Sequence, residues 1–239
     1  MMNLVIDSGN TRFKAATFSG VQLEQKYSFS NEEELKAFLI HQTFNHAIVS
    51  SVSLDGTEML RWINASNKFL LTPLLPLPIH IRYETPETLG VDRIAAVCGG
   101  MDLFRDRDLL VIDAGTCITY DLIDRHQNYH GGAISPGISM RFEALHTFTE
   151  RLPLVSKTGD FKLVGGSTEA CIRSGVLNGA LAEMDGIVAN YQQLYPDLGV
   201  VLCGGDSFFF ENKLKHTIFA APDLVLSGLN RILLHNAVL

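Results

Sequence analysis

Two short apolar runs, each ending in an aspartate and a glycine, open two similar halves of the chain. The first is Leu4-Val5-Ile6-Asp7, followed by Ser-Gly-Asn, and residues 109–115 repeat this order as Leu-Leu-Val-Ile-Asp-Ala-Gly. A second apolar run follows each glycine, which predicts a strand, a tight turn and a second strand in both places.

The pattern between these hairpins predicts an alternation of strands and helices. Apolar residues at helical spacing follow Ser30, and Ser30 with Glu33 fits a capping box. We expect strands at 21–29, 47–52 and 69–71, helices from 30, at 58–65 and from 91, and a proline-rich loop or extended edge at 72–79.

The second half has the same character. We expect a strand at 128–134, a helix after 135–137, a loop at 151–163, a long helix capped by 165–169, a strand at 200–203 and a last helix from 221. Glycines at 175, 179 and 186 interrupt the long helix at about 1 kcal/mol each, which suggests close packing on another helix, such as that of a second subunit. This order predicts mixed sheets flanked by helices, in domains 1–107 and 108–239.

Composition restricts the class of protein. The 239 residues are 46% hydrophobic and 19% charged, and the net charge is −7. We therefore expect a globular chain that binds neither nucleic acid nor an anionic membrane. No apolar run approaches the ~20 residues of a membrane span, no secretory signal is apparent, and the four cysteines are scattered, so we expect a cytoplasmic location.

The repeated hairpins suit phosphate binding. Gly9 and Gly115 let the backbone approach a ligand, while backbone N–H groups and the hydroxyls of Ser8, Thr11 and Thr116 can donate to phosphate oxygens. One hairpin alone would be an ordinary turn, but two copies favour phosphate binding by both halves. The Walker and Rossmann glycine motifs are absent from the sequence.

Several carboxylates remain open as a catalytic base. Asp92 lies in the first turn of a predicted helix, where it would also complement the helix dipole, and the residues alone do not separate it from Asp121 or Glu169. Arg93 could bind an anionic group through its planar fork. His126 and His130 fall in a predicted hairpin, where their spacing does not favour a zinc site.

Five motifs together resemble the type III pantothenate kinases of the acetate kinase, sugar kinase, Hsp70 and actin superfamily. They are Asp7-x-Gly-Asn-Thr-x-x-Lys14, Gly90-Val-Asp-Arg93, Asp113-Ala-Gly-Thr116-x-x-Thr119-x-Asp121, Gly131-Gly-x-Ile-x-Pro-Gly137 and Gly204-Gly-Asp206. The resemblance implies duplicated ribonuclease H-like (actin-like ATPase) domains, each with a mixed five-stranded sheet. It also implies transfer of the ATP γ-phosphate to the 4′-hydroxyl of pantothenate, the first step of coenzyme A synthesis.

The resemblance assigns roles residue by residue. Asp92 is the implied general base, Asp113 the ligand of a monovalent cation, K⁺ or NH₄⁺, and the family is dimeric. Implied ATP contacts are Asp7, Ser8, Gly9, Asn10, Thr11, Arg12, Phe13, Lys14 and Thr116. Implied pantothenate contacts are Tyr83, Gly90, Val91, Asp92, Arg93 and Thr168.

Charge arithmetic independently requires cations. Two unit charges 4 Å apart repel by about 4 kcal/mol at an effective dielectric of about 20. Asp7, Asp113 and Asp121 around the phosphates of ATP therefore predict Mg²⁺, with Asp7 as a ligand, directly or through water. Competing interpretations are another small-molecule kinase of the superfamily, a polyphosphate phosphatase, or a regulatory relative without catalysis.

Overall fold

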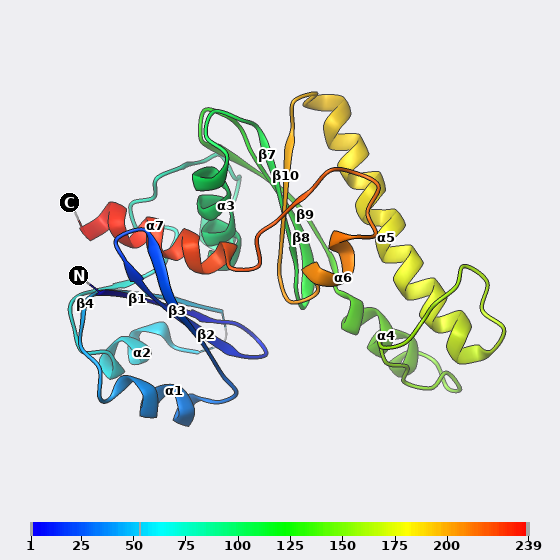
Figure 1. The fold of residues 1–239 in the computed structure, drawn as a ribbon, viewed down its shortest axis with the longest axis horizontal. Coiled ribbons are helices and arrows are strands. Elements are labelled where there is room, and N and C mark those ends of the chain that lie inside the picture. The colour runs from blue at the N-terminus through cyan, green and yellow to red at the C-terminus, as the bar shows by residue number, and fades with distance from the viewer. Residues whose placement is uncertain (1, 53, 238–239) are drawn as a thin grey trace. The chain divides into compact units, whose positions relative to one another are not determined.

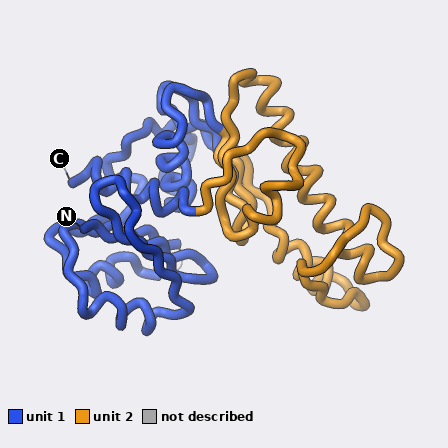
Figure 2. The backbone as a smooth tube through the Cα atoms, viewed as in Figure 1, with its two compact units in different colours: residues 1–109, 121–131, 223–239 blue, residues 110–120, 132–222 orange. Residues whose placement is uncertain are grey.

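The chain is described here by a computed structural model that covers residues 2–52 and 54–237. It forms two compact units (Figure 2): unit 1 comprises residues 1–109, 121–131 and 223–239, and unit 2 comprises 110–120 and 132–222. The predicted division at 107/108 follows the sequence duplication and stays a prediction. The C-terminal helix belongs to unit 1, because it packs with the N-terminal half of the chain.

Unit 1 contains a mixed five-stranded sheet of order β3-β2-β1-β4-β5, as predicted. Strand β1 pairs antiparallel with β2 and parallel with β4, and this register sets Asp7 opposite Lys14. The strands are β1 (Met2–Ser8), β2 (Phe13–Ser19), β3 (Gln22–Phe29), β4 (Phe44–Ser51) and β5 (Ala65–Leu70).

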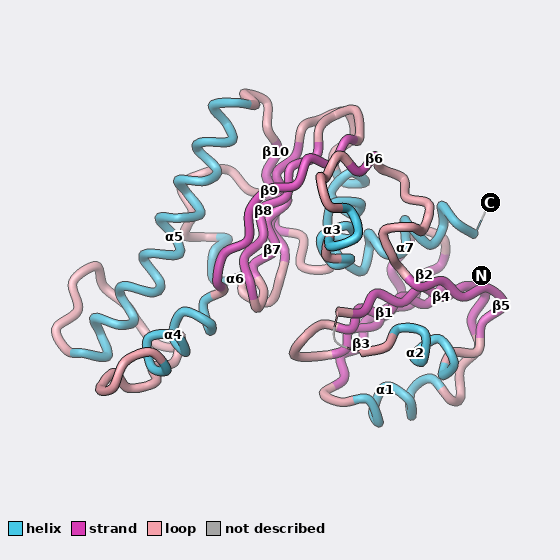
Figure 3. Tube along the Cα trace, turned by 180° about the vertical axis from the view of Figure 1, so that it is seen from behind, coloured by secondary structure: helices cyan, strands magenta, loops and turns pink. Residues whose placement is uncertain are grey.

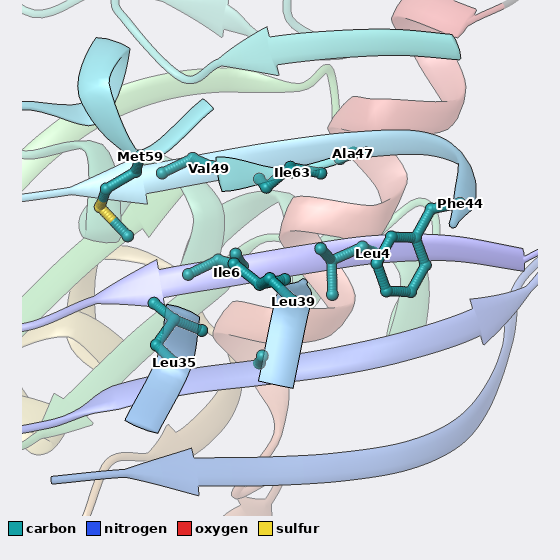
Figure 4. Packing of buried hydrophobic residues seen from close by; sticks show 10 residues of the cluster. Leu4, Ile6, Leu35, Leu39, Phe44, Ala47, Val49, Met59 and Ile63 are labelled. Atoms are coloured by element: carbon teal, nitrogen blue, oxygen red, sulfur yellow. The ribbon is translucent and has the colours of Figure 1, made fainter. Parts of the chain in front are cut away.

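Helices cover both faces of this sheet, with α1 (Glu32–Leu39) and α2 (Gly56–Trp62) on one face and α3 (Val91–Leu103) and α7 (Leu224–Ala237) on the other (Figures 1 and 3). Alternation along β1 turns Leu4 and Ile6 toward α1 and α2 (Figure 4). The buried cluster on that face comprises Leu4, Ile6, Ala15, Leu35, Leu39, Phe44, Ala47, Val49, Met59 and Ile63.

Glycines permit the close approach of α3 and α7. A Cβ on Gly99 would overlap the carbonyl of Leu224, and one on Gly228 would overlap the carbonyl of Ala95. Backbone therefore packs on backbone at this crossing, which fixes α3 and hence the position of its first turn.

The cap of α1 lies one residue later than predicted. Asn31, and not Ser30, is the N-cap, and its side chain accepts from the N–H of Glu34 at 2.9 Å. Glu34 in turn accepts from the N–H of Ser30 at 2.8 Å. The predicted Ser30–Glu33 capping box is therefore wrong, although the helix that it announced is present.

The second sheet has six strands, in the order β11-β10-β7-β8-β9-β6, where five were expected. The extra strand is β6 (His80–Ile81), which directly follows the proline-rich segment and pairs parallel with β9. The other strands are β7 (Leu109–Ala114), β8 (Cys117–Ile123), β9 (Asn128–Pro136), β10 (Gly199–Cys203) and β11 (Phe219–Ala220).

Unit 2 carries the helices α4 (Ile138–Thr147), α5 (Thr168–Leu194) and α6 (Ser207–Glu211). Ser167 caps α5 by accepting from the N–H of Ala170 at 3.2 Å, as its position predicted. Apart from the neighbouring backbone of α5 itself, no described atom lies within 4 Å of a Cβ placed on Gly175, Gly179 or Gly186. Within 2–52 and 54–237, no helix has the length and apolarity to cross a membrane.

Candidate active site

The first hairpin places Asp7 at the carboxyl end of β1. The turn is closed by a hydrogen bond from the N–H of Gly9 to the carbonyl of Arg12 at 3.2 Å. Asn10, Thr11 and Arg12 are exposed at its tip, whereas Ser8 is fully buried. The tip therefore offers backbone and side-chain donors to solvent, as a phosphate loop requires, and Ser8 lies beneath it.

Asp92 lies in the first turn of α3, with Gly90 as the N-cap residue. Its Oδ1 accepts from the N–H of Arg93 at 2.9 Å. A Cβ on Gly90 would lie 2.6 Å from the same oxygen, so glycine leaves room for the carboxylate. The first turn of α3 thus holds the Asp92 carboxylate in a defined orientation.

The charge of Asp92 acts on Asp7 in the first hairpin. Burial raises the pKa of Asp7 to about 6, Lys14 across the strand pair lowers it, and the charge of Asp92 raises it. Asp7, Lys14 and Asp92, three residues predicted from widely separated motifs, therefore come together within unit 1. Two carboxylates and one lysine leave this cluster with excess negative charge, which a bound cation would offset.

A second cluster in unit 1 is formed around Arg93, the residue after Asp92 in α3. The Arg93 guanidinium donates to Asp121 Oδ1 from Nε at 2.9 Å and from Nη2 at 2.7 Å, and Tyr129 donates to the same oxygen at 2.7 Å. Arg93 Cζ lies 5.9 Å from the ring centroid of Tyr83. Asp121 is fully buried and faces Arg93 and Tyr129, and its expected place around the phosphates of ATP stays a prediction.

The hairpin of unit 2 is packed backbone against backbone. Gly137 donates its N–H to the carbonyl of Thr116 at 3.1 Å, and a Cβ there would overlap that carbonyl. Gly204, with φ of +94°, lies so close to Asp113 that a Cβ would overlap its Oδ1. The motifs around Asp113, Gly137 and Gly204 therefore converge on one turn, and Thr116 is exposed at its tip.

The alternative bases differ in their surroundings. Asp121 is committed to Arg93 and Tyr129, and Glu169 is an exposed residue in the first turn of α5 in unit 2. Thr168 is also exposed at that helix start. Asp92 alone among the three lies beside the Asp7 hairpin in its unit.

The histidines of the β8–β9 hairpin form no zinc-like constellation. His130 Nε2 lies 2.8 Å from Asp124 Oδ2, and Asp124 also accepts from the N–H groups of His126 and Asn128. These hydrogen bonds lower the pKa of Asp124 to about 2 and stabilise the turn between β8 and β9. No group of three or more His, Cys, Asp or Glu residues with metal-binding geometry occurs in the described ranges.

The residues present fit phosphate-bound cations better than a protein-only metal cage. Asp7 is a half-buried carboxylate whose ionisation is opposed by the charge of Asp92, so a cation shared with phosphate oxygens would relieve both. The glycines at 115 and 204 leave space beside Asp113 Oδ1 that a side chain would fill. Mg²⁺ typically uses one or two carboxylates together with substrate phosphates, and Asp7 could supply one such carboxylate.

Sequence reasoning missed some residues of these clusters. Tyr129 was not singled out, and its signal was weak because one tyrosine in a strand is usually a core residue. The contact between Gly131 and Tyr83 was also missed: with φ of +89°, Gly131 lies where a Cβ would be 2.8 Å from the Tyr83 ring. The paired glycines at 131 and 132 were the available signal.

The fold defines the class. Sheets flanked by helices, with an acid-tipped glycine hairpin in each unit, are the arrangement of actin-like ATPases and sugar kinases. Solved structures with this fold include a conserved putative Baf family transcriptional activator from Campylobacter jejuni (TM-score 0.67, 22% identity, 99% of this chain and 100% of that chain). Another is a putative N-acetylmannosamine kinase from Listeria monocytogenes (TM-score 0.56, 12% identity, 99% of this chain and 100% of that chain).

Sequence comparison identifies the family. The family model described as type III pantothenate kinase matches residues 3–190. Proteins named type III pantothenate kinase are 47% identical in Bacteroides fragilis, over 98% of both chains, and 42% identical in Christiangramia forsetii, over 98% of this chain and 99% of the other. The chain belongs to the type III pantothenate kinase family.

Proposed function

We propose that this protein transfers the γ-phosphoryl group of ATP to the 4′-hydroxyl of pantothenate, the first step of coenzyme A biosynthesis. The observation that carries the proposal is the cluster of Asp7, Lys14 and Asp92 in unit 1 of a chain that matches its family over nearly its whole length. A phosphate loop beside a carboxylate base is what phosphoryl transfer to an alcohol needs.

Asp92 is the proposed general base. Its Oδ1 accepts from the N–H of Arg93, which leaves Oδ2 for the substrate hydroxyl. As the hydroxyl oxygen attacks the γ-phosphorus, its proton passes to Asp92 and ADP leaves. A base in this position contributes about 10²–10⁴ in rate.

The two hairpins are the proposed ATP contacts. In unit 1 these are residues 7–14, where Lys14 supplies a positive charge opposite Asp7, and in unit 2 the exposed Thr116 supplies a hydroxyl. When bound, Mg²⁺ neutralises phosphate charge at Asp7, and a monovalent cation, K⁺ or NH₄⁺, does the same at Asp113. Pantothenate contacts are proposed for Tyr83, Gly90, Val91, Arg93 and Thr168.

Cation dependence tests this assignment. Purified protein with pantothenate and MgATP should release ADP in K⁺ or NH₄⁺ and much more slowly in Na⁺ alone. Omitting Mg²⁺ should abolish the reaction. Equal rates in all three monovalent salts would contradict the proposed role of Asp113, whereas ADP release that does not need pantothenate would contradict the proposed substrate and favour another kinase or a phosphatase.

A homodimer is proposed from the exposed surface of unit 2. Leu163 and Val164 are each 81% exposed, and α5 presents a face of small residues at Gly175, Gly179 and Gly186. Large apolar side chains beside a glycine face are typical of a helix that packs closely on a partner. A mass measurement in solution should give about twice the 26.3 kDa of one chain.

A substitution on α5 separates packing from intrinsic helix propensity. In an isolated helix Gly179→Ala should add about 1 kcal/mol of stability, because alanine is the better helix former. If a second copy packs on this face, the same change should instead weaken the dimer. Unchanged dimerisation together with a more stable chain would contradict the proposed interface.

A cytoplasmic location is also proposed, because the four cysteines are scattered along the sequence and a metabolic kinase family is compatible with that compartment.

A further inference from the structure

A buried ion pair lies directly behind the proposed acceptor site. Arg93 is 7% exposed and Asp121 is fully buried, and both nitrogens that Arg93 directs at Asp121 contact the same oxygen, Oδ1. Tyr129, also fully buried, donates its hydroxyl to that oxygen. Three donors on one carboxylate oxygen fix the guanidinium in position and in rotation.

The pair is continuous with residues that the substrate is proposed to contact. Arg93 follows Asp92 in the first turn of α3 and lies below the Tyr83 ring, 5.9 Å from its centroid. The Tyr83 and Tyr129 rings are 6.1 Å apart with their planes inclined at 44°. Gly131 removes the side chain that would otherwise push the Tyr83 ring away.

We propose that Asp121 and Tyr129 are positioning residues of the acceptor site, which hold Arg93 and, through it, Tyr83 in the orientation that binds pantothenate. This inference rests on the proposed function. It also changes the role of Arg93: because Asp121 neutralises its charge and occupies Nε and Nη2, Arg93 offers its remaining edge as a directional donor. The planar guanidinium edge of Arg93 that was predicted to bind the substrate therefore faces Asp121.

The energetics of the pair favour a role other than stability. A buried ion pair loses much of its Coulomb gain to desolvation, so well-packed apolar residues would often serve the fold as well or better. Three donors on one oxygen, two of them from the residue next to the proposed base, are explained by the need for a fixed guanidinium. A merely structural pair would not require that geometry at this position.

Asp121→Asn is the test, because it keeps the shape of the side chain and removes its charge. We expect the KM for pantothenate to rise about tenfold, the effect of weakening a charged hydrogen bond, while the KM for ATP stays within about twofold. Tyr129→Phe, which removes only a hydroxyl, should change the same constant in the same direction by a smaller factor and keep the protein folded.

Asp108→Asn is the matched control. Asp108 also binds an arginine, Arg125, through Nε at 3.2 Å and Nη2 at 2.7 Å, but it contacts none of the proposed site residues. Both Michaelis constants should stay unchanged in this variant. If Asp108→Asn also raised the KM for pantothenate and left the KM for ATP unchanged, the change would be a general effect of a broken ion pair and would overturn the inference.

Other outcomes are equally decisive. Unchanged pantothenate KM in both Asp121→Asn and Tyr129→Phe would overturn the positioning role while leaving the kinase assignment intact. A parallel loss of kcat, ATP affinity and melting temperature in both variants would assign the pair to the fold alone. A wild-type protein without pantothenate-dependent ADP release would overturn the proposed function and this inference with it.

Discussion

Replacing Asp7 by asparagine should stabilise the nucleotide-free protein while removing its activity. Burial raises the pKa of Asp7 from 3.8 to about 6; Lys14 opposes this rise and Asp92 adds to it. The folded state therefore holds a proton on Asp7 more tightly than the unfolded chain does, so ionising the group opposes folding. This cost is small near pH 4, grows as the pH rises through 6, and is complete above about pH 7.

The magnitude follows from the shift. About two pKa units correspond to at most about 3 kcal/mol, and because Asp7 is partly accessible to solvent we expect a gain of about 1–3 kcal/mol at pH 7.5. For a chain of this length each kcal/mol raises the melting temperature by about 2–4 °C. At pH 5 the gain should fall to about half, because folded Asp7 is then largely protonated.

Thermal unfolding in EDTA, without nucleotide, measures this gain for Asp7→Asn at the two pH values. Asp108→Asn is the control of opposite sign: the hydrogen-bonded Arg125 lowers the pKa of Asp108, so its carboxylate stabilises the fold at neutral pH and its removal should lower the melting temperature. ATP turnover of Asp7→Asn should fall about 100-fold or more. Equal or lower stability of Asp7→Asn at pH 7.5, or a gain that does not shrink at pH 5, would refute the reasoning.

Three further predictions concern the base and two glycine contacts. Asp92→Asn should reduce kcat by about 10²–10⁴ while calorimetry still detects ATP binding, and turnover near that of the wild type would exclude the proposed base. Gly204→Ala places a Cβ against Asp113 at a left-handed φ, so it should cost about 1–3 kcal/mol and raise the KM for ATP, whereas Gly205→Ala, which meets no atom within 4 Å, should do neither. Gly228→Ala forces α7 away from α3 and should lower the melting temperature by several degrees; a stabilised variant, as helix propensity alone would give, would contradict the packing.

Much of the fold could be predicted because local signals agree with the packing. The apolar run of β1, the cap at Ser167 and the helical spacing from Val91 each predict an element that the structure contains. The elements that were missed are short. Strands β6 and β11 each have two residues and α6 has five, so their formation depends on a neighbouring strand or turn and not on a pattern of their own.

The candidate site divides in the same way. The hairpins, Asp92 and the glycine turns could be predicted from the sequence, because each needs a particular residue at a particular backbone position. The pairing of Arg93 with Asp121 could not be predicted in this way. In the sequence Asp121 is one of several acids near the second hairpin, and only the folded sheet places it against Arg93 of α3. Long-range pairing decides such contacts, and one sequence does not encode them in any local pattern.

The central claim is tested most directly by identifying the product. Wild-type protein incubated with pantothenate, MgATP and K⁺ should form one phosphate monoester of pantothenate per ADP released, with the phosphate on the primary alcohol, as mass spectrometry and ³¹P NMR would show. Asp92→Asn at the same concentration should form little or none. ADP without a phosphorylated pantothenate, or equal product from Asp92→Asn, would contradict the account.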